Sequence, residues 1–321
     1  MDRILVVMKM DEDQRDMLKR AAPASRIDFV NPKELKEEQA EAADVIIGNL
    51  PERFLPHIRR AKLLQLQTSG VAESYLKLPR YAPDTILCSA SGAYGVPIAE
   101  YMLGTLLTLM RRLHIYRDDM KEGRWQPRFE GMSMHGARGL SLGMGDIGTE
   151  FSTRCALLGA QVIGIRRRAA QPPAGIERVA AMEELDELLP WADVVALSLP
   201  QTEETVGIMN RARFEKMKGG SYLINVGRGS AVDQEALLWA LQSGKLAGAG
   251  LDVCDPEPLP GDHPLWKQEN LLLTPHISGQ YFLKSTQDRI TRLICGNLKA
   301  LRDGGKLTAR VDFETGYRKQ G

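Results

Sequence analysis

The segment LSLGMGDIGTEFSTRCALL, residues 140–158, places a glycine-rich turn between a short apolar run and an amphipathic stretch. Its turn, GMGDIG at 143–148, matches the pattern G-x-G-x-x-G, which is a weak signal by itself. The flanking strand and helix strengthen it, because glycines allow a tight turn and a helix N-terminus offers N–H groups to an anion. The segment therefore predicts a dinucleotide-binding β-α-β unit in which Gly143, Gly145, Asp146 and Ile147 contact the cofactor.

Short apolar runs and amphipathic stretches alternate from this segment toward the C-terminus. The predicted strands lie at 140–142, 162–165, 194–197, 222–226, 249–251 and 271–273. Alternation of this kind indicates a parallel sheet covered by helices. The pattern predicts a Rossmann-type, doubly wound parallel sheet of six strands, and hence an α/β protein.

A second, smaller sheet is predicted before this region. Its strands lie at 3–8, 27–30, 45–47, 63–67 and 86–88, which fits a flavodoxin-like parallel-sheet domain. Residues 98–121 read as one long helix, and a last helix at 283–302 is expected to return to the smaller domain. We therefore expect one domain of residues 1–97 completed by 284–321, and another of residues 98–283.

Composition restricts the class of protein. The 321 residues suit two domains, and a net charge of +1 gives no reason to expect nucleic acid or a membrane as partner. The four cysteines form no C-x-x-C pair and no metal-ligand spacing, so we expect reduced thiols and no metal site. No apolar run has the length of a signal peptide or a membrane span, which predicts a cytoplasmic protein.

The end of the second strand of the larger sheet indicates which cofactor fits. A site for NAD needs an acidic residue there to hold the ribose diol. The chain instead offers Arg166, Arg167 and Arg168, and Arg166 lies 23 residues after Gly143. Guanidinium groups pair with phosphate in a bidentate way, so we expect Arg166 and Arg167 to favour NADP. The alternative is a solvated basic turn that tolerates NAD.

Three chemically active residue types each follow the end of a predicted strand: Arg228, Glu257 and His276. Ligands of open parallel sheets bind outside the carboxyl ends of the strands. A protonated histidine can give a proton to a ketone oxygen as hydride reaches the carbon, and a carboxylate can fix its tautomer. An arginine can hold a substrate carboxylate with two hydrogen bonds. Asp252 and Asp255 are alternative acids to Glu257.

These segments resemble those of the D-isomer-specific 2-hydroxyacid dehydrogenase family, over nearly the whole chain. The resemblance includes Leu199-Pro200-Gln201-Thr202, the run MKGG at 217–220 and the block 225–258. It implies that Arg228 binds substrate, that Glu257 is the partner acid and that His276 is the catalytic acid and base.

The same resemblance implies binding roles for both domains. Residues 98–283 would be the dinucleotide-binding domain, in which Asp252 contacts the nicotinamide end of the cofactor. Residues 1–97 would be the substrate-binding domain, in which the backbone of Ser69, Gly70 and Val71 helps to bind the substrate carboxylate. The remaining implied cofactor contacts come from Leu199, Pro200, Val226, Gly227, His276 and Gly279.

The implied activity is reduction of a small 2-keto acid to the D-2-hydroxy acid with NAD(P)H, by hydride transfer to the carbonyl carbon and proton transfer from His276. Two departures bear on the substrate. Ser89 stands where the family often has Asn, and no cation occurs between Asn49 and Arg53, which weakens the case for a phosphorylated substrate. A glyoxylate/hydroxypyruvate reductase-like enzyme is the resulting subtype, with branched or aromatic 2-keto acids left open.

Two further interpretations use the same fold. A corepressor that senses nicotinamide nucleotides can keep the Arg, Glu and His, although no basic tract or disordered extension supports it here. A formate dehydrogenase is expected to have Gln beside the catalytic histidine, where this chain has Glu257. The helix predicted at 98–121 carries an apolar stripe, and relatives form a twofold interface in this region, so we expect a homodimer.

Overall fold

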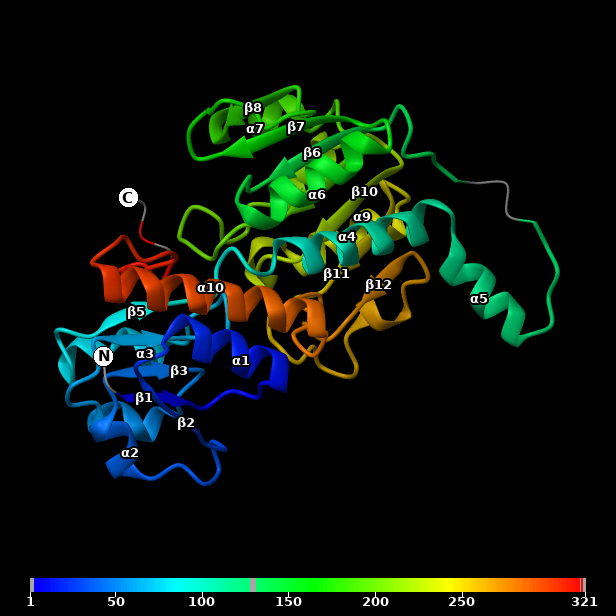
Figure 1. Cartoon of the computed structure of the whole chain (residues 1–321). Helices are drawn as coiled ribbons and strands as arrows, with labels where there is room; N and C mark the ends of the chain where they lie inside the picture. The colour runs from blue at the N-terminus through cyan, green and yellow to red at the C-terminus, as the bar shows by residue number, and fades with distance from the viewer. Residues whose placement is uncertain (1–2, 128–130, 318, 320–321) are drawn as a thin grey trace. The chain divides into compact units, whose positions relative to one another are not determined.

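Two parallel β-sheets organise the chain (Figure 1). The computed structural model describes residues 3–127, 131–317 and 319. The chain divides into two compact units, of which the first is Met1–Tyr94 with Tyr281–Gly321 and the second is Gly95–Gln280. Each unit contains one of the sheets, and the predicted fold class, a Rossmann-type sheet plus a smaller flavodoxin-like sheet, is confirmed.

The smaller sheet has the strand order β2-β1-β3-β4-β5, the flavodoxin-like order, and all its pairings are parallel. Its strands are β1 (Arg3–Val6), β2 (Arg26–Phe29), β3 (Val45–Ile47), β4 (Leu63–Gln65) and β5 (Ile86–Cys88). Its helices are α1 (Glu12–Ala21), α2 (Glu37–Ala42), η1 (Glu52–His57), α3 (Glu73–Leu76), η2 (Leu78–Arg80) and α10 (Lys284–Asp303). The three central strands are short and buried on both faces, as their apolar sequences require.

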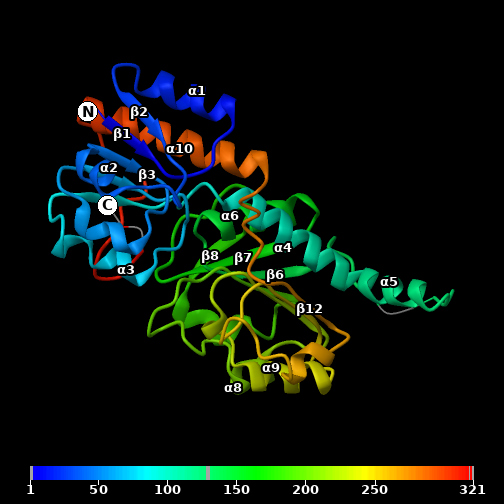
Figure 2. The same cartoon turned by 90° about the horizontal axis from the view of Figure 1, so that it is seen from below.

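Helices α1 and α10 run side by side on this unit, as Figures 1 and 2 both show. Helix α1 begins with a capping box, in which Asp11 accepts a hydrogen bond from the Gln14 amide at 2.9 Å and the Gln14 side chain returns one at 3.0 Å. The Gln14 side chain also donates to Asp288 of α10 at 2.8 Å. The C-terminal helix is thereby joined to the first helix by a partly buried polar contact.

The larger sheet has the strand order β12-β11-β10-β9-β6-β7-β8, and all its pairings are parallel. Its strands are β6 (Arg138–Leu142), β7 (Gln161–Arg166), β8 (Arg178–Ala181), β9 (Val194–Leu197), β10 (Ser221–Asn225), β11 (Leu246–Leu251) and β12 (Leu271–Leu273). Its α-helices are α4 (Gly95–Met110), α5 (Leu113–Lys121), α6 (Asp146–Leu157), α7 (Leu185–Leu188), α8 (Arg211–Lys216) and α9 (Gln234–Gln242). Short 3-10 helices are η3 (Met182–Glu184), η4 (Gly229–Ala231) and η5 (Pro264–Lys267).

The prediction of six strands in this sheet was wrong, because β8 makes a seventh. This strand has the sequence RVAA, and β7 is the one named strand with which it pairs. Two of its four residues are alanines, which have low β propensity, and an edge strand needs less apolar surface than a central one. Its sequence therefore lacks the apolar run by which the other six strands were found.

The prediction of one long helix at 98–121 was also wrong. The chain forms α4 and α5, separated at Arg111 and Arg112. Arg112 has a left-handed backbone with φ of 54°, and its amide donates to the Leu109 carbonyl at 3.0 Å. A left-handed residue of this kind ends a helix, and it is usually glycine or asparagine. The break was not visible in the sequence because an arginine takes that place.

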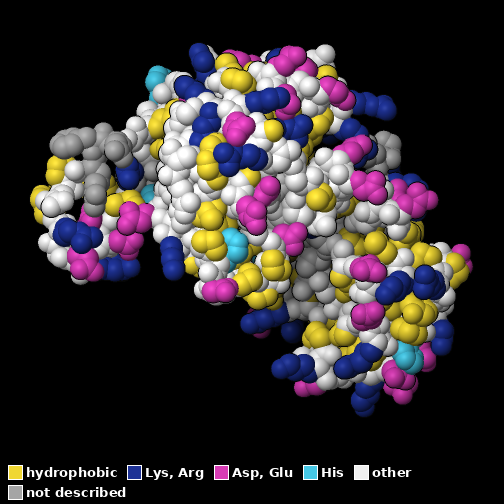
Figure 3. Space-filling view, turned by 180° about the vertical axis from the view of Figure 1, so that it is seen from behind, with side chains coloured by type: hydrophobic (Ala, Val, Ile, Leu, Met, Phe, Trp, Pro, Cys, Tyr) yellow, Lys and Arg dark blue, Asp and Glu magenta, His cyan; other side chains and the backbone are white. Residues whose placement is uncertain are grey.

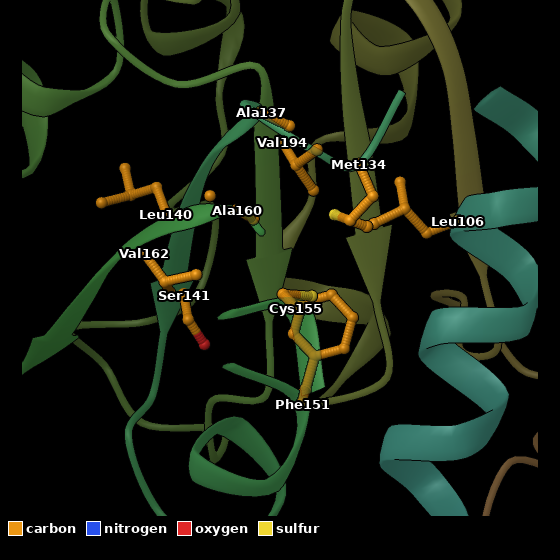
Figure 4. A pocket seen from close by; sticks show the side chains of 11 residues that line it. Leu106, Met134, Ala137, Leu140, Ser141, Phe151, Cys155, Ala160, Val162 and Val194 are labelled. Atoms are coloured by element: carbon orange, nitrogen blue, oxygen red, sulfur yellow. The ribbon is translucent and has the colours of Figure 1, made fainter. Parts of the chain in front are cut away.

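A narrow apolar gap lies beneath the larger sheet, between β6, β7, β9, α4 and α6 (Figure 4). Phe151 and Cys155 of α6 border it, and the Ser141 hydroxyl on β6 has no hydrogen-bond partner among the described residues. Burial raises the pKa of Cys155 to about 12, which keeps the thiol protonated and unreactive. This gap lies within the hydrophobic core and holds no group suited to catalysis.

Candidate active site

The glycine-rich turn connects β6 to α6 where the strand order of the larger sheet reverses, between β6 and β9. Gly148 is tightly packed, since a methyl group added to it would lie 2.0 Å from the Gly143 carbonyl oxygen. The Ser198 hydroxyl, which follows β9, donates to the same oxygen at 2.8 Å. Ligands of doubly wound sheets bind at this reversal point, so the turn has the position that a dinucleotide site requires.

The start of α6 has room and donors for a diphosphate. Gly145 is the N-cap residue, it is exposed, and no described atom lies within 4 Å of the place where its side chain would be. The N-cap residue Gly145 has no side chain to cap the first turn of α6, in which Asp146 and Ile147 are the first two residues. Uncapped N–H groups at the positive end of a helix bind phosphate, and the residues present therefore fit a nicotinamide dinucleotide.

The basic run follows β7 at the same edge of the sheet. Arg166 is the last residue of this strand, and Arg166 and Arg167 are both exposed. The Arg167 Nε atom lies 4.0 Å from an exposed Glu204 carboxylate oxygen, a separation at which water weakens the attraction. Because β7 pairs with β6 in parallel, the cations and the glycine turn lie on neighbouring strand ends.

Four further residues expected to contact the cofactor follow two adjacent strands. Leu199 and Pro200 come after β9, and Val226 and Gly227 come directly after β10. The two strands pair in parallel, and the Val226 amide donates to the Leu197 carbonyl at 3.1 Å. The structure thus brings both pairs of residues to the edge of the sheet that carries the glycine turn.

Arg228 is held by the turn that carries it. The buried Asn225 side chain accepts a hydrogen bond from the Gly227 amide at 3.0 Å and donates one to the Arg228 carbonyl at 2.9 Å. The next residue, Gly229, packs so closely that an added methyl group would lie 1.9 Å from the Cys254 carbonyl carbon. This contact fixes the arginine-bearing turn against the loop that carries Glu257.

Glu257 and His276 form a hydrogen-bonded pair. The His276 Nδ1 atom lies 2.9 Å from Glu257 Oε2, and the other carboxylate oxygen accepts the Cys254 amide at 3.1 Å. Both side chains are partly exposed. Because Nδ1 faces the carboxylate, Nε2 is the ring nitrogen available to a substrate. Of the three candidate acids, Glu257 is the one whose carboxylate contacts the imidazole ring.

Asp252 has a different environment, because it is buried beneath the loop that carries His276. Its side chain is 1% exposed, and one carboxylate oxygen accepts the Thr274 hydroxyl at 2.6 Å and the Ile277 amide at 2.8 Å. The other oxygen accepts the Ser278 amide at 2.8 Å. A carboxylate oxygen has two acceptor positions, so this second oxygen can accept one more donor, such as a carboxamide N–H. Gly279 follows directly in the same loop.

In the smaller unit, the three residues expected to bind the substrate carboxylate follow β4. The Thr68 hydroxyl donates to the Gly70 carbonyl at 2.8 Å, and the Ser69 hydroxyl lies 3.4 Å from that of Ser91. Gly70 is exposed, whereas Val71 packs against the core of this unit. The loop therefore presents backbone groups at a strand end while its last side chain anchors it.

Sequence reasoning missed the residues that support this site. Asn225 lies inside the block 225–258 and Thr274 lies two residues before His276, but neither position indicates which groups these side chains hold. Tyr101 lies on α4, outside every motif, and its hydroxyl is 2.5 Å from the Thr274 hydroxyl. Among the described residues there is no group of three His, Cys, Asp or Glu side chains placed to hold a metal ion, and no helix with the length and apolar character to cross a membrane.

Comparisons with known proteins agree with this geometry. A family model described as "D-isomer specific 2-hydroxyacid dehydrogenase, NAD binding domain" matches residues 103–278. A glyoxylate reductase from Thermofilum pendens is 36% identical over 260 residues, which cover 78% of this chain and 75% of the relative. A D-3-phosphoglycerate dehydrogenase from Archaeoglobus fulgidus is 34% identical over 199 residues, which cover 60% of this chain but 37% of that relative.

A solved structure resembles the whole chain. It is a D-isomer specific 2-hydroxyacid dehydrogenase family protein from Aeromonas salmonicida, with a TM-score of 0.85 and 33% sequence identity. The match covers 97% of this chain and 99% of the other.

Proposed function

Because the chain belongs to the D-isomer specific 2-hydroxyacid dehydrogenase family, we propose that it reduces a small 2-keto acid to the D-2-hydroxy acid with NADPH as cofactor. The observation that carries this proposal is the pair of His276 and Glu257, with 2.9 Å between Nδ1 and Oε2. Each of these residues, like Arg228, follows the end of a parallel strand on the sheet that bears the glycine turn.

The residues divide the chemistry among them. The bound cofactor supplies a hydride to the carbonyl carbon of the substrate. Arg228 binds the substrate carboxylate and orients the carbonyl group, and the backbone of Ser69, Gly70 and Val71 serves as a further carboxylate contact. His276 gives the proton on Nε2 to the carbonyl oxygen, and Glu257 holds the ring in the orientation that this transfer needs.

The cofactor is held along the carboxyl edge of the larger sheet. The first turn of α6 binds the diphosphate, and the arginines after β7 bind the 2′-phosphate of NADPH. Asp252 accepts a hydrogen bond from the nicotinamide carboxamide. The remaining cofactor contacts come from Leu199, Pro200, Val226, Gly227 and Gly279.

Glyoxylate and hydroxypyruvate are the proposed substrates, in line with the 36% identical glyoxylate reductase. The test is oxidation of NADPH by the purified protein with glyoxylate, hydroxypyruvate, pyruvate and phenylpyruvate, followed by chiral analysis of the product from the last three. We expect turnover with a small keto acid and the D product. Tight NADPH binding without turnover of any keto acid would contradict the proposal and favour a nucleotide-sensing binding protein.

We also propose that the protein is a homodimer assembled through α5 and the segment after it. Helix α5 extends away from the sheet of its own unit (Figures 1 and 2), and Figure 3 shows hydrophobic side chains among charged ones on this arm. Leu113 and Met120 are 54% and 66% exposed, Trp125 is 99% exposed, and Tyr116 is exposed on the same helix face. Apolar side chains at i, i+3 and i+7 form one stripe, which a second copy would cover.

A further inference from the structure

Two hydroxyl groups and one carboxylate form a hydrogen-bonded chain from α4 to the loop that carries His276. The Tyr101 hydroxyl lies 2.5 Å from the Thr274 hydroxyl, which lies 2.6 Å from the Asp252 carboxylate. A carboxylate only accepts, so the single proton of Thr274 is used on Asp252. The tyrosine must therefore donate to the threonine. Both hydrogen bonds are then donated in the same direction, from Tyr101 to Thr274 and from Thr274 to Asp252.

The Asp252 carboxylate in turn holds the loop. It accepts the amides of Ile277 and Ser278, each at 2.8 Å, while its backbone carbonyl accepts the His276 amide at 2.9 Å. His276 itself has a left-handed backbone, with φ of 53°. A non-glycine residue adopts this conformation at a cost in energy, and the surrounding hydrogen bonds must compensate for it.

Close packing fixes the tyrosine relative to this loop. Helix α4 crosses β11 (Figure 1), and a methyl group added to Gly250 on that strand would lie 2.4 Å from the Thr105 methyl group of α4. Thr105 is one helical turn after Tyr101, and Asp252 lies two residues after Gly250. Burial raises the pKa of Tyr101, with a further contribution from the negative charge of Asp252, so the phenol keeps its proton and remains a donor.

We propose that Tyr101 is a positioning residue for His276, and that it acts through Thr274 and Asp252. This inference rests on the proposed function for its effect on turnover. The Tyr101 hydroxyl contacts Thr274, and its effect reaches His276 through Thr274 and Asp252. It donates to Thr274, and Thr274 orients the Asp252 carboxylate, which accepts the amides of Ile277 and Ser278, the two residues directly after His276.

The test compares Tyr101→Phe, Thr274→Val, the double variant and Thr274→Ser. We expect Tyr101→Phe to lower kcat by about tenfold at most, which corresponds to the net free energy of one hydrogen bond. The Kd of NADPH should change by less than about twofold. Because both residues act through one chain, the double variant should equal Thr274→Val alone. Thr274→Ser keeps the hydroxyl and should restore most of the activity. Tyr222→Phe, the same change on β10, is the matched control.

A second measurement does not depend on turnover. Amide hydrogen exchange at Ile277 and Ser278 should accelerate in Tyr101→Phe and stay unchanged in Tyr222→Phe. Wild-type kcat together with wild-type exchange in Tyr101→Phe would overturn the inference, and so would losses that add in the double variant. If the wild-type protein reduced no keto acid, the proposed function would be wrong, and the exchange rates alone would decide the role of Tyr101.

Discussion

Glu257 Oε2 lies 2.9 Å from His276 Nδ1, while the Cys254 amide binds the other oxygen of the same carboxylate at 3.1 Å. The Glu257 carboxylate is therefore fixed in place by the backbone of its own loop, and it in turn fixes the histidine ring. This arrangement leaves the opposite edge of the imidazole ring, which carries Nε2, for a substrate. It also lets the two residues be tested separately, because each has a distinct task.

His276→Ala should remove the proton donor and reduce kcat by about 10² to 10⁴ while the Kd of NADPH changes little. Glu257→Gln keeps the shape but loses the charge of the acceptor, so a smaller loss of about 10- to 100-fold in kcat is expected. Stopped-flow measurement of NADPH oxidation, with fluorescence titration for the Kd, gives both values. Wild-type turnover in His276→Ala would rule out its role as proton donor.

Arg228→Lys should lower kcat/KM for the keto acid by about 10-fold or more, chiefly through a higher KM. Lysine keeps the positive charge but cannot form the bidentate pair with a carboxylate. Steady-state kinetics with hydroxypyruvate would show the effect. An unchanged KM would mean that another group holds the carboxylate.

Arg166→Ala should reduce the ratio of kcat/KM for NADPH to kcat/KM for NADH by about tenfold, since a charge-assisted hydrogen bond to the 2′-phosphate is lost. Arg178→Ala removes an exposed arginine from the neighbouring strand β8 and serves as the control. The kinetics with NADH should stay near the wild-type values in both variants. If kcat/KM of the wild-type protein is tenfold higher for NADH than for NADPH, the assignment of the arginines to the 2′-phosphate is wrong.

Gly229→Ala should destabilise the protein by about 1–3 kcal/mol, because its methyl group would collide with the Cys254 backbone 1.9 Å away. The shift should also displace the Arg228 turn and raise the KM for the keto acid. Gly219→Ala, where no described atom lies within 4 Å of the added methyl group, is the control. Urea unfolding gives the free energies, and equal stability of the two variants would contradict the predicted collision.

Leu113→Asp combined with Met120→Asp should convert the proposed dimer to a monomer, because two charges would enter the apolar stripe of α5. Asp118→Ala lies on the opposite helix face and should leave the dimer intact. Light scattering coupled to size-exclusion chromatography reports the mass. A monomeric wild-type protein would refute the proposal directly.

Much of the larger sheet was predictable, because its central strands are buried on both faces and read as apolar runs. The runs at 194–197 and 222–226 correspond to the fully buried strands β9 (Val194–Leu197) and β10 (Ser221–Asn225). Strand β8 escaped prediction because an edge strand with alanines carries little of that signal. The break between α4 and α5 escaped because Arg112 has the backbone conformation that sequence patterns associate with glycine.

The sequence by itself determined the fold class, the glycine turn and the three residue types at strand ends, because periodicity and local motifs encode them. Only the tertiary structure decided that Glu257, and not Asp252 or Asp255, faces His276. It also joined Tyr101 to Thr274 across 173 positions of the chain. Such contacts depend on how a helix packs against a sheet, and no local pattern of residues records that packing.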